Sequence, residues 1–296
     1  MPKQRVTANR LGYHVLAILV VLVWGATFVN SKILIQHGLQ VHEIFVIRFL
    51  LAYVCIWFLP PRRLWSDNWR DELRMVLLGL TGGSLYFVTE NMAVRLDYVN
   101  NVSFIVCTAP LLTTLLALVF VRGLRPTPRL LGGSLLALVG VALVVFNGQF
   151  VLRLNPLGDA MAFAAALCWA VYSLLMRGVS HYSAVFVTRK VFAYGLLTVL
   201  PFFWFHPWQA SPRLLFQPVV AANLLFLGLM ASFACFALWS LAIKKIGVVS
   251  TSNYVYLNPV TTVLASALFL DEPMTSVACL GSALILGGVI LANACG

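Results

Sequence analysis

The chain has 296 residues, of which 61% are hydrophobic and only 10% are charged, and its mean hydropathy is +0.94. A soluble domain carries about 25% charged residues, so this composition excludes a soluble globular protein and predicts an all-α integral membrane protein. The net charge of +11 is dispersed over short loops, a distribution typical of membrane proteins and not of a nucleic-acid-binding face. We therefore expect the lipid bilayer as its surroundings and no nucleic acid as a partner.

Apolar stretches of membrane-spanning length follow one another along the whole chain. A helix needs about 20 mostly apolar residues to cross the hydrocarbon core. Ten stretches meet or approach that length, and no connection between them is long enough to hold a soluble domain. In chain order, the predicted helices cover residues 13–35, 43–60, 73–94, 98–121, 129–147, 157–177, 184–205, 219–243, 248–270 and 275–294.

The two halves of the sequence are related. The segments FVIRFLLAYVCIWFLP (45–60) and FVTRKVFAYGLLTVLP (186–201) share seven of sixteen residues at a shift of 141, and a later block recurs at a shift of 149. We expect two five-helix repeats, residues 1–150 and 151–296, that form one structural unit around a central cavity. Five is an odd number, so the second repeat should enter the membrane from the opposite side and be inverted relative to the first.

The distribution of basic residues predicts the orientation. With the N-terminus in the cytoplasm, thirteen basic residues fall on the cytoplasmic side, four on the opposite side and three within segments. Cytoplasmic loops carry the excess of Lys and Arg in membrane proteins. We therefore expect a multi-pass protein of the cell (inner or plasma) membrane with both termini in the cytoplasm. Residues 1–12 are basic, but a full span follows them, so we expect no cleavable signal.

One face of the first segment and one face of the sixth carry aromatic and hydroxyl side chains at helical spacing. Trp24 and Trp169 correspond between the repeats and lie about half-way along their helices, where no headgroups reach. We expect these faces to line the cavity; packing between helices and anchoring in an interfacial belt are the alternatives. The two faces consist of Trp24, Thr27, Phe28 and Ser31, and of Trp169, Tyr172, Ser173 and Met176.

Charged residues inside the second, third and seventh segments need partners, because an intramembrane charge is costly. Glu90 is the only carboxylate well inside a span, and Tyr86 lies one turn earlier. We expect Glu90 to carry a proton or bind an amine; a structural hydrogen bond or access to water is the alternative. Its repeat counterpart is Trp239, so no symmetric pair of acids exists. The cations expected to snorkel or to bridge helices are Arg48, Arg189 and Lys190.

The fourth and ninth segments begin with polar side chains. Helix N-termini leave free N–H groups and a positive dipole end, which can receive a carboxylate. Simple helix capping is the alternative. The residues expected near such a carboxylate site are Asn101, Ser103, Ser252 and Tyr254.

Proline and glycine predict further features of the later helices in each repeat. Pro110 and Pro259 lie at equivalent positions and should kink the fourth and ninth segments. Equivalent kinks suit a gate or hinge, although proline is also tolerated in lipid without such a role. Small residues let helices approach closely, so we expect the fifth and tenth segments to pack through Gly132, Gly133, Gly140, Gly281, Gly287 and Gly288.

The last two segments resemble the drug/metabolite transporter superfamily, EamA type. Trp24-Gly25 with Phe28 is also similar to that family's opening helix, and the resemblance covers essentially the whole chain. It implies a ten-helix exporter with a central cavity, and the aromatic amino acid exporters are the most similar subgroup. The first repeat departs from the pattern because Gly123 stands where the second has Glu272. The pattern consists of Asn258-Pro259-Val260, Leu264, Leu270-Asp271-Glu272-Pro273, Gly281, Leu284-Ile285 and Gly288.

Together these features predict a secondary transporter that exports amino acids or related small metabolites, above all large apolar or aromatic amino acids, by alternating access. A nucleotide-sugar, phosphate-ester or drug transporter of the same fold is an alternative, and a membrane enzyme or a non-transporting scaffold is the alternative from another class.

Scattered histidines, the absence of paired acids and the absence of CxxC or a phosphate-binding glycine loop argue against an enzyme, metal or cofactor. We expect a monomer. The predicted substrate-binding residues are Trp24, Thr27, Tyr86, Glu90, Asn101, Ser103, Trp169, Tyr172, Ser173, Trp239, Ser252 and Tyr254.

Overall fold

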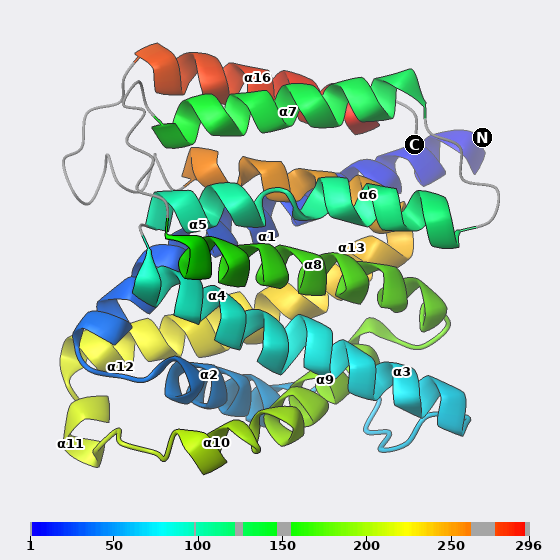
Figure 1. The fold of residues 1–296 in the computed structure, drawn as a ribbon. Coiled ribbons are helices and arrows are strands. Elements are labelled where there is room, and N and C mark those ends of the chain that lie inside the picture. The colour runs from blue at the N-terminus through cyan, green and yellow to red at the C-terminus, as the bar shows by residue number, and fades with distance from the viewer. Residues whose placement is uncertain (1, 98, 122–126, 147–154, 262–275, 294–296) are drawn as a thin grey trace.

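The computed structural model describes residues 2–97, 99–121, 127–146, 155–261 and 276–293. Within these ranges every regular element is a helix, and helices occupy the described parts of all ten predicted segments (Figure 1). The elements are α1 (Pro2–Gln36), α2 (Val41–Ile56), α3 (Trp69–Gly79), η1 (Leu80–Ser84), α4 (Leu85–Leu96), α5 (Val99–Val106), α6 (Ala109–Phe120), α7 (Pro128–Phe146), α8 (Pro156–Gly178), α9 (Ala184–Val199), α10 (Phe202–Phe205), α11 (Pro212–Leu215), α12 (Pro218–Leu225), η2 (Phe226–Ala234), α13 (Cys235–Ile246), α14 (Val248–Ser252), η3 (Asn253–Leu257) and α16 (Ser276–Asn293).

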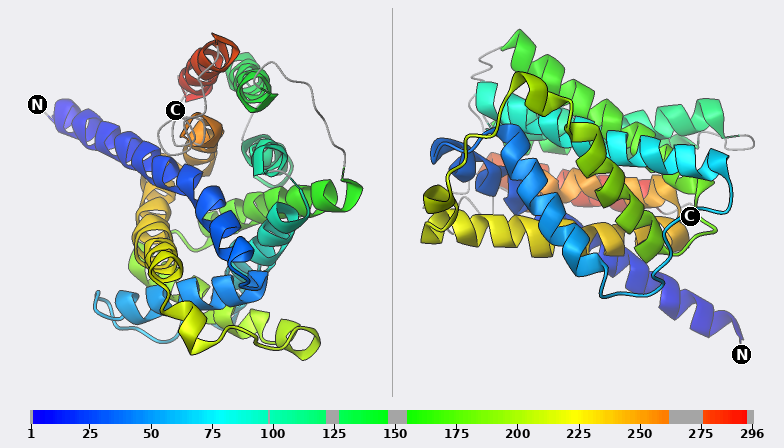
Figure 2. Two further views of the ribbon diagram at one scale, coloured as in Figure 1. Left: turned by 90° about the vertical axis from the view of Figure 1, so that its left-hand side faces the viewer. Right: turned by 90° about the horizontal axis from the view of Figure 1, so that it is seen from below.

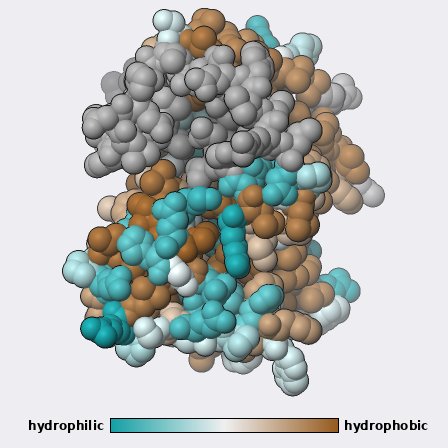
Figure 3. All heavy atoms as spheres, turned by 60° about the vertical axis from the view of Figure 1, so that its left-hand side comes forward, coloured by the Kyte–Doolittle hydropathy of each residue, from teal (hydrophilic) through white to brown (hydrophobic). Residues whose placement is uncertain are grey.

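Several helices are suited to a lipid environment. Among the described residues, five helices are long and apolar enough to cross a membrane, and two shorter ones are similarly apolar. Large apolar side chains are exposed on their outer faces, for example Phe120 at 68% and Ile290 at 70%. Figure 3 shows apolar residues over much of one face of the described surface. The five long helices are Arg10–Gln36, Val102–Phe120, Pro156–Gly178, Ala184–Phe205 and Pro218–Ile246.

The beginning of α1 and the end of α16 lie at the same end of the bundle (Figures 1 and 2). We call this the termini end and the opposite one the far end. The α2–α3 and α8–α9 connections lie at the termini end, whereas the α1–α2 connection lies at the far end (Figure 1).

Two π-helical stretches interrupt long helices near the centre of the bundle. They are η1, between α3 and α4, and η2, between α12 and α13, and they recur at the shift of 149 seen in the sequence. A π-helical turn alters the normal backbone pairing and is frequent at functional sites. In η1, a Cβ at Gly82 would lie 2.1 Å from the Tyr172 ring of α8, so only glycine fits there. In η2, the carbonyl oxygen of Ala231 accepts a 2.9 Å hydrogen bond from Trp24 Nε1 of α1.

The helices that contain Pro110 and Pro259 are irregular, as predicted. Proline lacks the N–H that continues a helical ladder. α5 ends at Val106, and α6 begins at Ala109 with Pro110 in its first turn. In the second half the tight 3₁₀ helix η3 directly precedes the turn that contains Pro259. The thiol of Cys107 donates to the Val255 carbonyl across 3.7 Å and joins the two irregular helices near the bundle centre. Residues 262–275, which include Leu264 and the Asp271-Glu272-Pro273 motif, lie outside the described residues.

Helices α7 and α16 pack closely along each other at one side of the bundle (Figure 2). A Cβ at Gly133 or Gly288 would lie 2.5 Å from a backbone nitrogen of the opposite helix. The prediction is wrong for Gly132 and Gly287, where a Cβ would meet no atom within 4 Å because both point away from the partner helix. The glycines at the α7–α16 contact are Gly133, Gly140, Gly281 and Gly288.

These neighbouring glycines allow a matched test of the helix contact. Gly288→Ala should destabilise the protein by about 1–3 kcal/mol, because the added methyl group overpacks the contact. Gly287→Ala should leave the melting temperature unchanged or raise it, since alanine favours the helix and meets no atom there. Thermal unfolding of the purified variants in one detergent measures both effects. Equal melting temperatures for the two variants would contradict close packing at Gly288.

Candidate functional site

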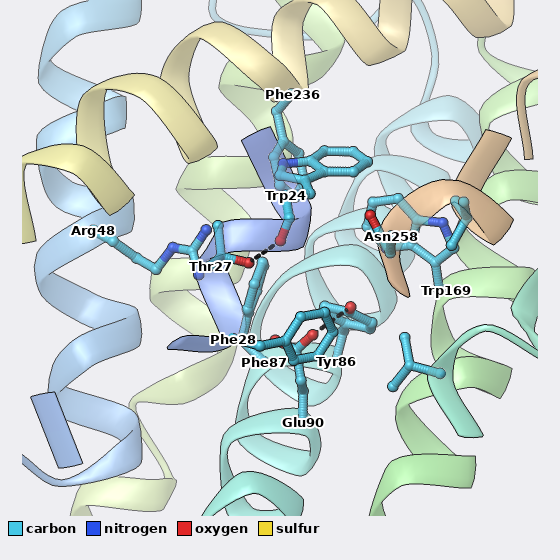
Figure 4. Close-up of a pocket in the computed structure, with 12 residues that line it drawn as sticks. Trp24, Thr27, Phe28, Arg48, Tyr86, Phe87, Glu90, Trp169, Phe236 and Asn258 are labelled. Carbon is cyan, nitrogen blue, oxygen red and sulfur yellow. Dashed lines mark hydrogen bonds between the residues drawn. The ribbon is translucent and has the colours of Figure 1, made fainter. Parts of the chain in front are cut away.

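A small closed cavity lies at the centre of the bundle, where α1, α2, α4, α8 and α13 meet the two irregular helices (Figure 4). No residue that lines it is more than 9% exposed. The lining side chains are therefore largely shielded from solvent by the described residues. Its walls are formed by Trp24, Thr27, Phe28, Arg48, Tyr86, Phe87, Glu90, Val106, Trp169, Phe236, Val255 and Asn258.

The cavity volume is about 30 Å³. That is close to the volume of one water molecule in the liquid, whereas pockets for small molecules span about 300–1,000 Å³. A metabolite therefore enters only after the surrounding helices move apart. The structure is a contracted state of the site.

Two tryptophans form the centre of the aromatic wall, and a third packs directly behind it. The rings of Trp24 and Trp169 meet edge to face with centroids 5.2 Å apart, and Trp239 lies 4.9 Å from Trp24. Tyr86 of α4 lies 5.1 Å from Trp169. The faces of α1 and α8 predicted from their helical spacing thus meet at Trp24 and Trp169. The Nε1 atoms of Trp169, in the wall, and of Trp239, behind it, find no hydrogen-bond partner among the described residues.

The cavity contains one guanidinium and one carboxyl group. Glu90 accepts a 2.7 Å hydrogen bond from Tyr86 Oη, and Arg48 Nε donates to Ser232 Oγ across 2.8 Å. No ion pair joins Arg48 to Glu90 within the described part of the chain. The hydroxyl of Thr27 donates to the Trp24 carbonyl of its own helix (Figure 4), so its donor is already used. The site therefore offers opposite charges on different helices between aromatic rings.

Several residues predicted for the site lie outside the cavity lining. Tyr172 and Trp239 pack behind the wall, against Trp169 and Trp24. Tyr254 is directed elsewhere, since its hydroxyl lies 2.7 Å from His14 Nδ1. The predicted serines are buried but do not line the cavity, and Asn101 lies in α5 with a side chain outside the described set. These serines are Ser103, Ser173 and Ser252.

Arg48 forms one of the helix-to-helix bridges predicted for it and, beyond that prediction, also lines the cavity. It bridges α2 to η2 through Ser232, and it is only 1% exposed. Its position inside an apolar helix indicated a buried partner or a cavity, but Arg189 shares that signal and lies outside the cavity lining. Phe87 and Phe236 also line the cavity, and nothing in their sequence context separates them from ordinary core residues.

Arg189 and Lys190 form the helix-to-helix bridges predicted for them. Arg189 donates to the carbonyls of Pro61 (2.6 Å), Leu59 (2.7 Å) and Ile56 (3.1 Å), where α2 ends. Lys190 of α9 forms an ion pair with Glu72 of α3, and Glu72 also accepts from Tyr194 Oη.

A polar network at the termini end continues from this ion pair. Asp71 of α3 accepts from Arg74 at 2.6 Å and lies 3.3 Å from His181 Nε2 in the α8–α9 connection. Asp67, in the α2–α3 connection, accepts a hydrogen bond from Arg63 that holds its pKa below the usual range. The network ties segments from the first half of the chain to α9 and its preceding connection. It is suited to holding the termini end closed.

A larger hollow of about 510 Å³ lies at the termini end, between the ends of α6, α8 and α13. Arg177 and Lys244 are the charged residues that line it, and most of the other lining residues are aliphatic. It lacks the aromatic walls and the carboxyl group of the central cavity.

The chain belongs to the EamA-like transporter family, which it matches over residues 11–146 and again over 156–294. It is 28% identical over 286 residues to an uncharacterized transporter of Archaeoglobus fulgidus, covering 95% of this chain and 97% of the relative. It is 26% identical to a probable amino-acid metabolite efflux pump of Escherichia coli, covering 94% and 93% of the two chains. It is also 26% identical to a probable terminal-alkyne amino-acid exporter of Streptantibioticus cattleyicolor, covering 93% and 91%.

One solved crystal structure superposes on the chain with a TM-score of 0.75 at 19% identity and covers 96% of each chain, which shows a shared fold. The family match over both parts of the chain confirms the predicted EamA resemblance. The protein is a multi-pass membrane transporter and not an enzyme.

Proposed function

We propose that the protein is a secondary exporter of amino acids or related small metabolites, with large apolar or aromatic amino acids as preferred substrates. The observation that carries this proposal is the buried cavity that combines an aromatic wall with one guanidinium and one carboxyl group. Aromatic faces favour bulky apolar side chains, and the two charged groups suit a zwitterion. The names of two relatives, which refer to amino-acid export, agree with this substrate class.

We also propose that residues 1–150 and 151–296 form two inverted five-helix halves and that ten spans cross the cell membrane with both termini in the cytoplasm. The recurrence of π-helical and proline irregularities at one sequence shift supports related halves. The common end for the first and last helices supports an even number of spans (Figure 1). Inverted halves allow alternating access, because each half can adopt the conformation that the other leaves.

The experiment that tests this function is counterflow into proteoliposomes with a panel of amino acids, sugar nucleotides and cationic drugs. We expect labelled phenylalanine to exchange with large apolar amino acids and only weakly with alanine. A phosphate ester is disfavoured because Arg48 is the one cation that lines the cavity within the described residues. Exchange of sugar nucleotides or drugs without amino acids would contradict the proposal.

The aromatic wall should determine the preference for the side chain. Trp169→Ala should weaken transport of phenylalanine about five-fold relative to alanine, because one well-placed aromatic contact contributes about 1 kcal/mol. Trp204→Ala is the matched control, since Trp204 is 89% exposed in α10. Competition in the same counterflow assay measures the ratio. Equal losses for small and large substrates would show that Trp169 serves packing or gating.

A further inference from the structure

The guanidinium of Arg48 is buried at the cavity, yet the protein itself uses only part of it. Its Nε donates to Ser232 Oγ, and its Cζ lies 4.3 Å above the ring centroid of Phe87. Arginine carries five N–H donors, and the four on Nη1 and Nη2 form no hydrogen bond to any described residue. Figure 4 shows the group extending from α2 towards Thr27. These two nitrogens are not among the fully buried polar atoms without a partner, and Arg48 lines the cavity, so a group that enters the cavity can accept from them.

Arg189, the repeat counterpart of Arg48, uses its terminal nitrogens within the protein, although its Nε has no partner among the described residues. Its Nη1 and Nη2 donate to three backbone carbonyls where α2 ends, and its Cζ lies 4.4 Å above the Trp57 ring. Arg189 does not line the cavity. The two arginines correspond in sequence, so the unused donors of Arg48 are not a general property of this repeat position.

Helix α4 contributes an acidic side chain, Glu90, to the wall of the cavity that Arg48 also lines. Glu90 is 6% exposed and accepts one hydrogen bond, from Tyr86. A carboxylate has two oxygens and about four acceptor positions, so Glu90 retains capacity for a further donor. Arg48 and Glu90 extend from different helices towards the aromatic rings (Figure 4) and form no ion pair with each other. Each is therefore available to a ligand group of opposite charge.

We propose that Arg48 determines specificity by binding the carboxylate of an α-amino acid through Nη1 and Nη2, while Glu90 receives the α-ammonium group. This inference rests on the proposed function and deepens it. A guanidinium fork binds a carboxylate through two parallel hydrogen bonds, a geometry that lysine cannot reproduce. The aromatic rings between the two charges then contact the side chain of the substrate. A carboxylate requirement follows, because without it the Nη1 and Nη2 donors of Arg48 have no acceptor among the described residues.

The test measures binding to the purified full-length protein with four phenylalanine-like ligands. Phenylalanine has both charges, its methyl ester and 2-phenylethylamine lack the carboxylate, and 3-phenylpropionate lacks the amine. The parent should bind phenylalanine at least ten-fold more tightly than the methyl ester. Arg48→Gln should weaken phenylalanine and 3-phenylpropionate about ten-fold or more and leave 2-phenylethylamine within two-fold. Arg48→Lys should restore part of the loss, because it keeps the charge without the fork.

Arg189→Gln is the matched control, since it should lower thermal stability without changing the ratio of acid to amine binding. Equal losses of all four ligands in Arg48→Gln, or an unchanged preference for phenylalanine, would overturn the role of Arg48 while leaving the exporter proposal in place. If the parent binds none of the amino acids, the proposed function fails and this inference fails with it. If Arg48→Gln does not fold, the preference of the parent for phenylalanine over its methyl ester decides the question alone.

Discussion

Glu90→Gln should abolish the pH dependence of substrate binding and transport. An ammonium group binds a carboxylate and not a carboxylic acid, so the affinity of the parent for phenylalanine should rise with pH as Glu90 loses its proton. Glutamine has the same shape as glutamate and can still accept the hydrogen bond from Tyr86, but its side chain does not ionise. At the pH where the parent binds best, the variant should bind about ten-fold more weakly, because a charge-assisted hydrogen bond is lost.

The measurement is phenylalanine affinity and counterflow rate between pH 5.5 and 8 in parent and variant proteoliposomes. The other polar groups that line the same cavity are Tyr86 and Arg48 on neighbouring helices, together with Thr27 and Asn258. Asp67→Asn is the control, because Asp67 lies in the α2–α3 connection and its pKa is held below the usual range by Arg63. A pH response in Glu90→Gln that matches the parent would remove Glu90 from both the amine and the proton roles.

Breaking the Glu72–Lys190 ion pair should cost about 3 kcal/mol of stability, at the low end of the range for buried pairs, since both side chains are mostly buried. Lys190→Met leaves the Glu72 carboxylate in place without its cation and should lower the melting temperature strongly. Adding Glu72→Gln to Lys190→Met should recover most of that loss, because no uncompensated charge then remains.

A double-mutant cycle of thermal unfolding measures this coupling, with Tyr194→Phe to separate the tyrosine hydrogen bond. We also expect the rate of phenylalanine exchange by these variants to differ from that of the parent. The reason is that α3 and α9 should separate when the termini end opens. Additive losses from the two single variants would show that Glu72 and Lys190 do not stabilise each other. Transport by the stable double variant at the rate of the parent would contradict a gating role.

The ion pair lies in only one of two related helix contacts. α3 packs on α9, and α12 with η2 packs on α2 in the corresponding manner. At the shifts that relate the halves, the counterparts of Glu72 and Lys190 are Ala221 and Phe49, both without charge. The contact at the termini end therefore contains an ion pair that the corresponding positions of the α2 contact lack. We expect this difference to make the two contacts unequally costly to separate.

The sequence was sufficient for the helical segments and for the aromatic residues that meet at the central cavity. Trp24 and Trp169 were identifiable because helical spacing and repeat position agreed for both, and Glu90 with Tyr86 because a buried acid and a donor lay one turn apart. Such predictions depend on one helix or on one symmetric pair. They need no knowledge of how the helices are rotated against one another.

Arg48 could not be assigned in this way. It shares its repeat position with Arg189, and the sequence treats the two alike, whereas helix packing directs one to the cavity and the other to the end of α2. The same reason explains Gly132 and Gly287, which differ from their neighbours only in the direction that they face. Ser252 shows a related difficulty. The sequence marks it as a polar residue near a helix start, but does not show towards which side of the helix its side chain is directed; in the structure it is buried.

The location of a bound amino acid tests the central claim most directly. 4-Iodophenylalanine carries the large apolar side chain and both charges of the proposed substrate class, and its iodine can be located by anomalous diffraction from crystals of the complex. We predict one iodine position in an expanded central cavity, beside Trp24 and Trp169, with the carboxylate at Arg48. Iodine in the hollow beside Arg177 and Lys244, or a central cavity that stays closed and empty while the compound is transported, would contradict the account.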